Sequence, residues 1–443
     1  MEDKNLKIAS GIMVYLGMLG LSMMEYSSTR KSNSPFLLVK NVLQFAIGIV
    51  CFWLLGFGFA FGNTKSEFIG EDLFGSEDWL DNASTKGFDF NYLVLLGTFI
   101  VFIVNGAVAE KTQYGAYVIY TICISLFVWP VVVAWTYGKG WLYEAMPGSM
   151  IEKGSAVVYT FAGAFAVAGA VLTGRRNGRF GMLRDKYHLH RYGTYVFGAF
   201  LTILGLIGIP FYFGTKSGFM LLANLWICGS VSSVVSLKLL TFMCTDLDRH
   251  YIAIYQGFMA GMVFITSSSD FTTSWEAALH GLMSGGVFSL GVYGFNWLGI
   301  DDVMYMGPTF LFPGIFGGIL PGFIDHKEGV YWGGWESGQV LGANVTGTAT
   351  IFFWAIFWGI AIFGAMRILD ILNLAPVLIE KGMKRRTEIT QKGYQVKKGL
   401  KEKKKKHKKN IDVHEVKHED ENEHHDDSSG EGHHDKDELA QDQ

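Results

Sequence analysis

The residues of this sequence that could carry acid–base chemistry are few and far apart. His280 is the only histidine inside an apolar stretch, and Asp301 and Asp302 follow that stretch. No triad spacing and no glycine-rich phosphate loop is found. A lone histidine on an apolar face favours a packing role over a proton relay. The two aspartates are expected to begin a helix, whose positive end favours acids. We therefore expect no enzyme.

Metal-ligating residue types are present, but their spacing is not that of a metal site. The four cysteines lie in or beside apolar stretches and predict free thiols: Cys51, Cys123, Cys228 and Cys244. Four further candidates lie near the end of the chain, where no fixed geometry holds them: His424, His425, His433 and His434. We expect no metal, no cofactor and no nucleic-acid partner.

The elements that must position any functional residue are predicted from composition. Of the 443 residues, 50% are hydrophobic and 15% aromatic, and only 17% are charged, against about 25% in an ordinary soluble domain. The charges cluster and leave apolar runs of about 18 to 25 residues. This pattern excludes a soluble enzyme and predicts an all-α, multi-pass integral membrane protein.

Hydropathy predicts eleven membrane-spanning helices. Backbone amides in hydrocarbon need internal partners, so these stretches are helices and not strands. The spans are 7–25, 36–62, 92–109, 115–136, 155–173, 193–213, 219–240, 251–267, 276–298, 303–324 and 338–370.

Charges in the connections predict the orientation. Connection 174–192 carries five arginines and a lysine, whereas connection 63–90 carries seven acids and two lysines. Basic connections stay on the cytoplasmic or matrix-like side. With eleven spans, the N-terminus is expected outside and the C-terminus inside. The plasma membrane and the mitochondrial inner membrane both fit.

The chain divides into a membrane domain, residues 1–372, and a charged tail, residues 373–443, which is expected to be disordered. Seven lysines lie between Lys401 and Lys409, and 13 acids and six histidines follow from Asp412 onward. The lysine run is a candidate contact for anionic membrane lipid.

Six sequence stretches resemble the ammonium transporter family (Amt/Mep/Rh), and they occur in the family's order. Small-residue patterns are common among packed membrane helices, so the joint order carries the resemblance. The stretches are 41–48 with 57–62 and 68–70; 106–117, which reads GAVAEKTQYGAY; 154–159 with Gly169, Gly174 and Arg176; 238–240; 301–302 with Gly314 and Gly317; and 333–334 with 341–343.

The resemblance implies two pseudo-symmetric five-helix halves, a long last helix across the outside and a homotrimer. Family members are thought to bind ammonium on an outer aromatic vestibule and to pass it through an apolar pore lined by two histidines. Aromatic faces attract cations, and imidazoles hydrogen-bond without a permanent charge.

This chain departs from the family at the pore positions. By resemblance, Tyr159 and Phe310 replace the two pore histidines, and Leu96 and Ile209 replace the gate phenylalanines. Tyr137 and Phe213 take the places of the vestibule tryptophan and serine. The family's loop aspartate falls on Ile151, with the acid Glu152 one place later.

These departures favour a structural function. We expect a family-like protein with lost or altered ammonium conduction, serving as an accessory subunit of a larger membrane assembly. The alternative is an active channel for ammonium or a small neutral solute that uses Tyr137, Tyr159 and Glu152. A third interpretation is an ammonium sensor that signals through the tail. An open path between Tyr137 and Phe310 would separate the first two.

Overall fold

The computed structural model describes residues 2–374, apart from residue 32 and the segments 64–66, 76–85, 146–153, 181–186, 214–217, 244–246, 325–328 and 334. Helices make up nearly all of these described residues. A single isolated β-bridge, between Thr112 and Asn373, is recorded in this part of the chain. Glu152 and the charged tail from residue 375 onward lie outside the described residues.

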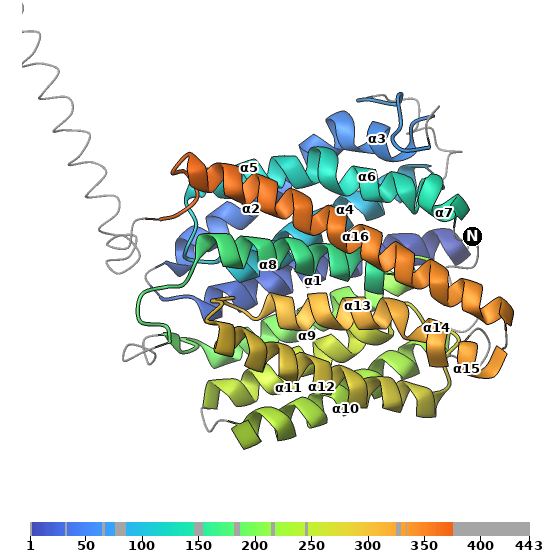
Figure 1. The fold of residues 1–443 in the computed structure, drawn as a ribbon. Coiled ribbons are helices and arrows are strands. Elements are labelled where there is room, and N and C mark those ends of the chain that lie inside the picture. Colours follow the sequence, from blue (N-terminus) through green and yellow to red (C-terminus); the bar gives the residue numbers. More distant parts are fainter. Residues whose placement is uncertain are drawn as a thin grey trace, which may run out of the picture. The chain divides into compact units, whose positions relative to one another are not determined.

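Each of the eleven predicted spans coincides with helical structure (Figure 1). The elements in order are α1 (Glu2–Ser28); α2 (Ser34–Cys51), η1 (Phe52–Gly56) and α3 (Phe57–Phe61); α4 (Lys86–Val108); α5 (Tyr114–Cys123), η2 (Ile124–Val128) and α6 (Trp129–Trp135); η4 (Ser155–Thr160) and α8 (Phe161–Thr173); α9 (Tyr192–Phe211); α10 (Gly218–Met243); α11 (Leu247–Ile265); α12 (Ser274–Leu298); η6 (Gly307–Leu311), α13 (Phe312–Ile319) and α14 (Pro321–Ile324); and α16 (Trp335–Ile368). The short helices α7 (Trp141–Ala145) and α15 (Val330–Gly333) lie in connections.

Eight helices of the described residues are individually long and apolar enough to cross a membrane. The other three predicted spans fall short for local reasons. The apolar part of α11 is short, from His250 to Ile265. Helix α12 carries Glu276, His280 and several glycines and serines, and the tenth span is divided among η6, α13 and α14.

Two helices that begin the two five-span halves pack closely against each other. Helix α1 runs along α9, and glycines occupy the contact. A Cβ atom on Gly17 would lie 2.8 Å from the Cα atom of Gly205, and one on Gly20 would lie 2.4 Å from the carbonyl oxygen of Gly198. Close packing of this kind associates helices in lipid, where hydrophobicity cannot.

The fifth and tenth spans cross near the centre of the bundle. Elements η4 and η6 are π-helical turns, and each begins its span. π-Helical turns re-aim side chains and often occur at functional sites. The long helix α16 runs obliquely across α8 (Figure 1), as the resemblance implies.

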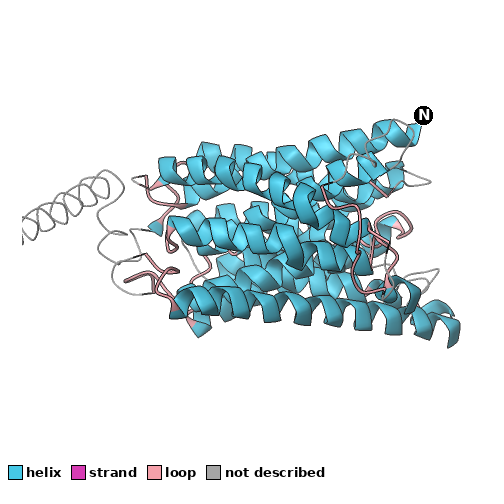
Figure 2. Ribbon diagram, turned by 90° about the horizontal axis from the view of Figure 1, so that it is seen from above, coloured by secondary structure: helices cyan, strands magenta, loops and turns pink. Residues whose placement is uncertain are grey.

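The helices run side by side, and the connecting loops gather at the two ends of the bundle (Figure 2). We call the end with the described residues of connections 29–33, 109–113, 174–191 and 299–306 the basic end. The opposite end, where α1 begins and where residues 62–63, 67–75 and 212–213 lie, is the acidic end.

Candidate functional site

The two positions that replace the pore histidines lie against each other. Tyr159 in η4 and Phe310 in η6 have ring centroids 5.8 Å apart with the rings tilted by 38°. Neither side chain has any solvent exposure. Two π-helical turns from different halves of the chain therefore bring these rings together at the crossing of the fifth and tenth spans.

The central pair offers little hydrogen bonding. Phe310 can neither donate nor accept. The Tyr159 hydroxyl has no partner at normal hydrogen-bond geometry within the described residues, and Thr266 is its polar neighbour. The Thr266 hydroxyl donates to the carbonyl oxygen of Met262 at 2.6 Å. An amine or ammonium at this level would meet aromatic carbon and one phenolic oxygen.

The two positions that replace the gate phenylalanines are also filled. Leu96 in α4 and Ile209 in α9 have no exposed surface. The carbonyl oxygen of Ile209 accepts a hydrogen bond of 2.9 Å from the hydroxyl of Tyr92. Aliphatic side chains at these positions exclude water but offer no ring face to a cation.

The acidic end keeps an aromatic surface. Tyr137 and Phe213 stack with centroids 5.3 Å apart, and both are half-buried. Tyr92 meets Phe213 edge-on at 6.3 Å and stacks on Tyr212 at 3.6 Å. Tyr92 thus connects the stacked pair Tyr137 and Phe213 to Ile209, which accepts its hydrogen bond. The six described residues that the sequence singled out therefore include two contacting pairs, Tyr137 with Phe213 and Tyr159 with Phe310.

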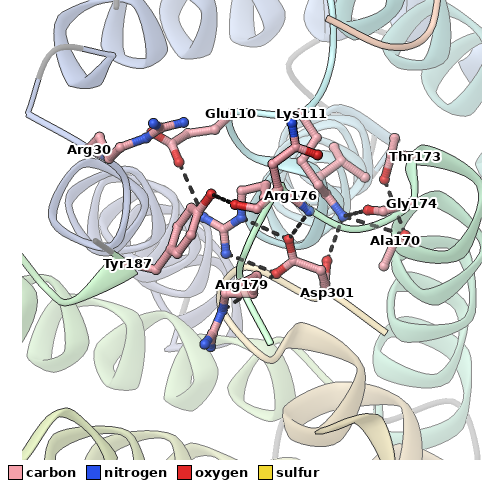
Figure 3. Close-up of polar contacts among 12 residues, drawn as sticks. Arg30, Glu110, Lys111, Ala170, Thr173, Gly174, Arg176, Arg179, Tyr187 and Asp301 are labelled. Atoms are coloured by element: carbon pink, nitrogen blue, oxygen red, sulfur yellow. Dashed lines mark hydrogen bonds and ion pairs between the residues drawn. The ribbon is translucent and has the colours of Figure 1, made fainter. Parts of the chain in front are cut away.

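A buried ion cluster at the basic end was not predicted as a unit (Figure 3). Arg176 donates to Asp301 from Nε at 2.8 Å and from Nη2 at 2.9 Å, and to Glu110 from Nη1 at 3.2 Å. Glu110 also accepts from the backbone of Arg30 at 2.7 Å and from Asn33 at 2.8 Å. The guanidinium thus joins three connections that lie far apart in the sequence, and Glu110 links the fourth, 29–33.

The electrostatics of this cluster favour the charged forms of its central pair. Burial alone would raise the pKa of Asp301, but Arg176 outweighs burial and holds this pKa well below its usual range. Burial alone would likewise lower the pKa of Arg176, but Asp301 and Glu110 raise it above its ordinary value. The Tyr187 ring covers the guanidinium of Arg176 at 4.6 Å. Such a covered, paired charge holds the connections together.

Two flanking groups in the same cluster have shifted pKa values. Burial lowers the pKa of Lys111 to about 8, although Asp301 opposes this change. Its ammonium donates to the carbonyl oxygens of Asp301 at 2.5 Å and Gly174 at 3.2 Å. Burial raises the pKa of Asp302 to about 6, against the backbone N–H of Gly307, which donates to it at 2.7 Å.

The expectation for the two aspartates is correct for one of them. Asp302 lies five residues before η6 and accepts from its first residue, so it interacts with the positive end of that helix as predicted, although the helix itself begins at Gly307. Asp301 does not; its carboxylate faces Arg176 in the 174–191 connection. The reason is that a buried guanidinium binds a carboxylate in two-pronged geometry more strongly than a helix end does.

A second polar group lies inside the first half, and the sequence reasoning missed it. Lys40 in α2 forms an ion pair of 2.9 Å with Glu25 in α1, and both are at most 2% exposed. The Lys40 ammonium also donates to Asn41 at 2.6 Å and lies 4.4 Å from the centroid of the Tyr117 ring. Opposite charges within two apolar stretches are the signal that could have found this pair, because charges at membrane depth need partners.

Amide side chains extend this second group. Glu25 accepts from Asn41 at 2.8 Å. Asn105 of α4 is within hydrogen-bond reach of Asn41, Gln44 and the Tyr120 hydroxyl. Gln44 in turn donates to Thr121 at 2.8 Å. The group ties α1, α2, α4 and α5 together.

His280 lies away from all of these groups. It is buried in α12 with its ring 5.7 Å from that of Phe264. The aromatic contact agrees with a packing role, but neither ring nitrogen of His280 has a hydrogen-bond partner within the described residues, so the side chain is not satisfied there. Across the described residues no group of three or more histidine, cysteine, aspartate or glutamate side chains could hold a metal ion.

Comparisons with known proteins identify the family. The sequence model of the Ammonium Transporter Family matches residues 6–383. The chain belongs to the ammonium transporter family. It is 25% identical over 414 residues to the ammonium transporter Amt2 of Archaeoglobus fulgidus, covering 83% of this chain and 82% of that one. It is 27% identical over 397 residues to ammonium transporter 1 member 2 of Oryza sativa subsp. japonica, covering 79% and 77%.

Solved structures agree on the fold. A protein described as a sensor Amt protein superposes with a TM-score of 0.77 at 23% identity, over 86% of this chain and 96% of that one. Mep2 of Saccharomyces cerevisiae gives a TM-score of 0.73 at 20% identity, over 84% and 87%. The fold prediction is confirmed: this family member is an integral, multi-pass helical membrane protein with the architecture of Amt and Mep2.

Proposed function

We propose that this member of the ammonium transporter family does not conduct ammonium and serves as a structural subunit of a membrane assembly. The observation that carries the proposal is the contact of Tyr159 with Phe310, fully buried at the two positions that would line the pore. A desolvated ammonium without hydrogen-bond partners costs several kcal/mol. The Tyr159 hydroxyl is the one hydrogen-bonding group that the side chains of this pair could offer to the ion.

The framework around the central pair supports the structural part of this proposal. Arg176 remains bound to Glu110 and Asp301, and Lys40 to Glu25. These contacts join connections and helices and do not approach the central rings. A chain that keeps such a framework and fills its centre is suited to present helix faces to partners.

The alternative is conduction by a different arrangement of the pore. Its support is that the named relatives are ammonium transporters and that Tyr137 and Phe213 keep some solvent exposure at the acidic end. The third interpretation, sensing, has the support of a structural neighbour described as a sensor. Conduction requires rearrangement of Tyr159 or Phe310 before a solute could pass, whereas sensing does not.

Complementation tests the main proposal. The chain is produced in a yeast strain that lacks its own ammonium transporters, with surface localisation verified by microscopy, and growth is followed on low ammonium. We expect no growth from the natural chain. A variant with both Tyr159→His and Phe310→His serves as the matched control for the two central positions. Robust growth of cells with the natural chain would overturn the proposal.

Oligomeric state tests the subunit role. The family resemblance implies a homotrimer. The small residues Gly229, Ser233, Gly281 and Gly285 of α10 and α12 contact neighbouring helices of the same chain, so they do not mark a face for another copy. We propose that the chain assembles either with two copies of itself or with unrelated membrane subunits. Native mass spectrometry of the protein from its own membrane, in mild detergent, distinguishes the two. An isolated monomer would contradict both.

A further inference from the structure

Two exposed arginines lie where helices end at the basic end of the bundle. Arg175 follows α8, and Arg367 lies in the last turn of α16. Helices α8 and α16 reach this end next to each other (Figure 1). Nη1 of Arg367 donates to the carbonyl oxygen of Leu172 at 3.0 Å, three residues before Arg175. A Cβ atom on Gly299, which ends α12, would lie 4.0 Å from Nη1 of Arg175. The two guanidiniums therefore lie along the ends of α16, α8 and α12.

These two arginines differ from those of the buried ion cluster. In the cluster, Arg176 and Arg179 both pair with the carboxylate of Asp301. Within the part of the chain that the structure describes, neither Arg175 nor Arg367 forms an ion pair with a carboxylate. Both side chains are exposed. Their N–H donors are thus available to an anion from outside the chain.

The backbone on both sides of Arg175 is held from inside the protein. The carbonyl oxygen of Gly174 accepts a hydrogen bond of 3.2 Å from the Lys111 ammonium. The backbone N–H of Arg176 donates to the carboxylate of Asp301 at 2.9 Å. Arg175 lies between these two anchored residues, so the ion cluster fixes the position from which its exposed side chain extends.

Exposed apolar side chains flank both guanidiniums. They lie in the last turns of α8 and α12 and at the end of α16, and each keeps between 50% and 85% of its surface exposed: Val171, Trp297, Leu298, Ile368 and Leu369. In a membrane protein, apolar side chains that are exposed to this degree face hydrocarbon, and tryptophan is typical of the membrane–water interface. The two arginines therefore lie at the border between lipid chains and headgroups.

We propose that Arg175 and Arg367 form a binding site for the phosphate group of an anionic phospholipid. A guanidinium binds phosphate in two-pronged geometry, and the flanking apolar side chains offer a surface to the acyl chains. Basic groups between helices on the cytoplasmic or matrix side bind such headgroups, and loop charge predicts that side for the basic end. The site lies at the edge of the bundle, so this inference is independent of the proposed loss of conduction.

Lipid titration of the full-length purified protein tests the proposal. Native mass spectrometry in mild detergent follows the binding of phosphatidylglycerol and of phosphatidylcholine with the same acyl chains. We expect the natural chain to bind the first phosphatidylglycerol about tenfold more tightly than phosphatidylcholine. A double variant with Arg175→Gln and Arg367→Gln should lose most of this preference and should bind phosphatidylcholine as the natural chain does. The charged tail is present in every variant and contributes equally.

Two further double variants serve as controls. Arg191→Gln with Lys238→Gln also removes two exposed positive charges, but from α10 and from the residue before α9. This control should keep the full preference for phosphatidylglycerol. Arg175→Lys with Arg367→Lys keeps both charges and should give an intermediate preference, because an ammonium binds phosphate only as a point charge.

Two more measurements complete the test. A large excess of inorganic phosphate should displace little phosphatidylglycerol, because acyl chains add to the affinity of a lipid; full displacement would assign the site to a free anion and overturn the lipid assignment. Thermal unfolding in lipid-free detergent should be alike for the natural chain and the glutamine variant, and phosphatidylglycerol should stabilise the natural chain more. Equal phosphatidylglycerol affinities of these two proteins, or an equal loss in the Arg191 and Lys238 control, would overturn the proposal.

Discussion

The centre of the bundle and its basic end are both buried, but apolar side chains fill the centre and charged side chains fill the basic end. At the centre, Tyr159, Phe310, Leu96 and Ile209 fill space with rings and aliphatic chains and make almost no hydrogen bonds. At the basic end, Arg176 alone joins two carboxylates from separate connections. The stability of the centre depends on how well its side chains fill space. The stability of the basic end depends on the charges of its side chains and on the directions of their hydrogen bonds.

The difference shows what each region can tolerate. Apolar groups of similar size can replace one another at modest cost, because dispersion and burial have little directional character. A buried ion pair cannot lose one partner without leaving an unpaired charge in a medium of low dielectric. The pore positions can therefore change with the fold intact, whereas the ion cluster must remain complete.

The largest effect is expected from breaking the ion cluster. Arg176→Met leaves Glu110 and Asp301 without their shared guanidinium and should lower the free energy of unfolding by about 3–5 kcal/mol. Arg175→Met is the matched control, since Arg175 is the neighbouring arginine in sequence and is exposed. Thermal unfolding in detergent measures both. Equal, small losses for the two variants would contradict the cluster's role.

The intramembrane pair should behave in the same way on a slightly smaller scale. Lys40→Met or Glu25→Gln alone leaves one buried charge and should cost about 3 kcal/mol. The double variant should recover most of this loss, because neither charge remains. A double-mutant cycle gives the coupling energy. Additive losses would show that the two side chains do not interact.

A smaller effect follows from the pKa of Asp302, which burial raises to about 6. The folded pKa exceeds the ordinary value of 3.8, so the native state binds more protons between these values. The carboxylate's burial penalty is therefore full above about pH 7 and is relieved progressively as the pH falls from about 6 to 3.8. Asp302→Asn should raise stability at pH 7.5 by on the order of 1 kcal/mol.

The same comparison at lower pH is the control for Asp302. At pH 5 the natural side chain is protonated in the folded state but still ionised in the unfolded state, so the difference between the two proteins should fall to roughly half of its value at pH 7.5 and vanish only below the ordinary pKa of 3.8. Melting temperatures of both proteins between pH 5 and pH 8 measure this. A difference that is constant across the range would exclude titration of Asp302 as its cause.

The smallest effect is expected at the centre. Tyr159→Phe removes a buried hydroxyl that has no partner at normal hydrogen-bond geometry, and should change stability by less than about 1 kcal/mol in either direction. Thermal unfolding checks this prediction. A loss as large as that of Arg176→Met would mean that the centre also depends on directional bonds.

Much of the fold could be predicted from local sequence. Hydropathy depends only on neighbouring residues, and for this reason all eleven expected spans coincide with helices. Local reasoning also placed Asp302 at the start of a helix, since its partner Gly307 is five residues away. The family followed from the order of short motifs, and the match over residues 6–383 confirms it.

The partners of charged side chains were decided only by the tertiary structure. Arg176 lies 66 residues from Glu110 and 125 from Asp301, and Lys7 lies 82 residues from Asp89. No local pattern pairs such residues, because many acids and bases compete for each other along the chain. The packing of the helices determines which charged side chains come together. For example, α1 lies along α9, and this contact brings Lys7 to Tyr212. Hydrophobicity therefore determined where the chain crosses the membrane, and packing determined which charges meet.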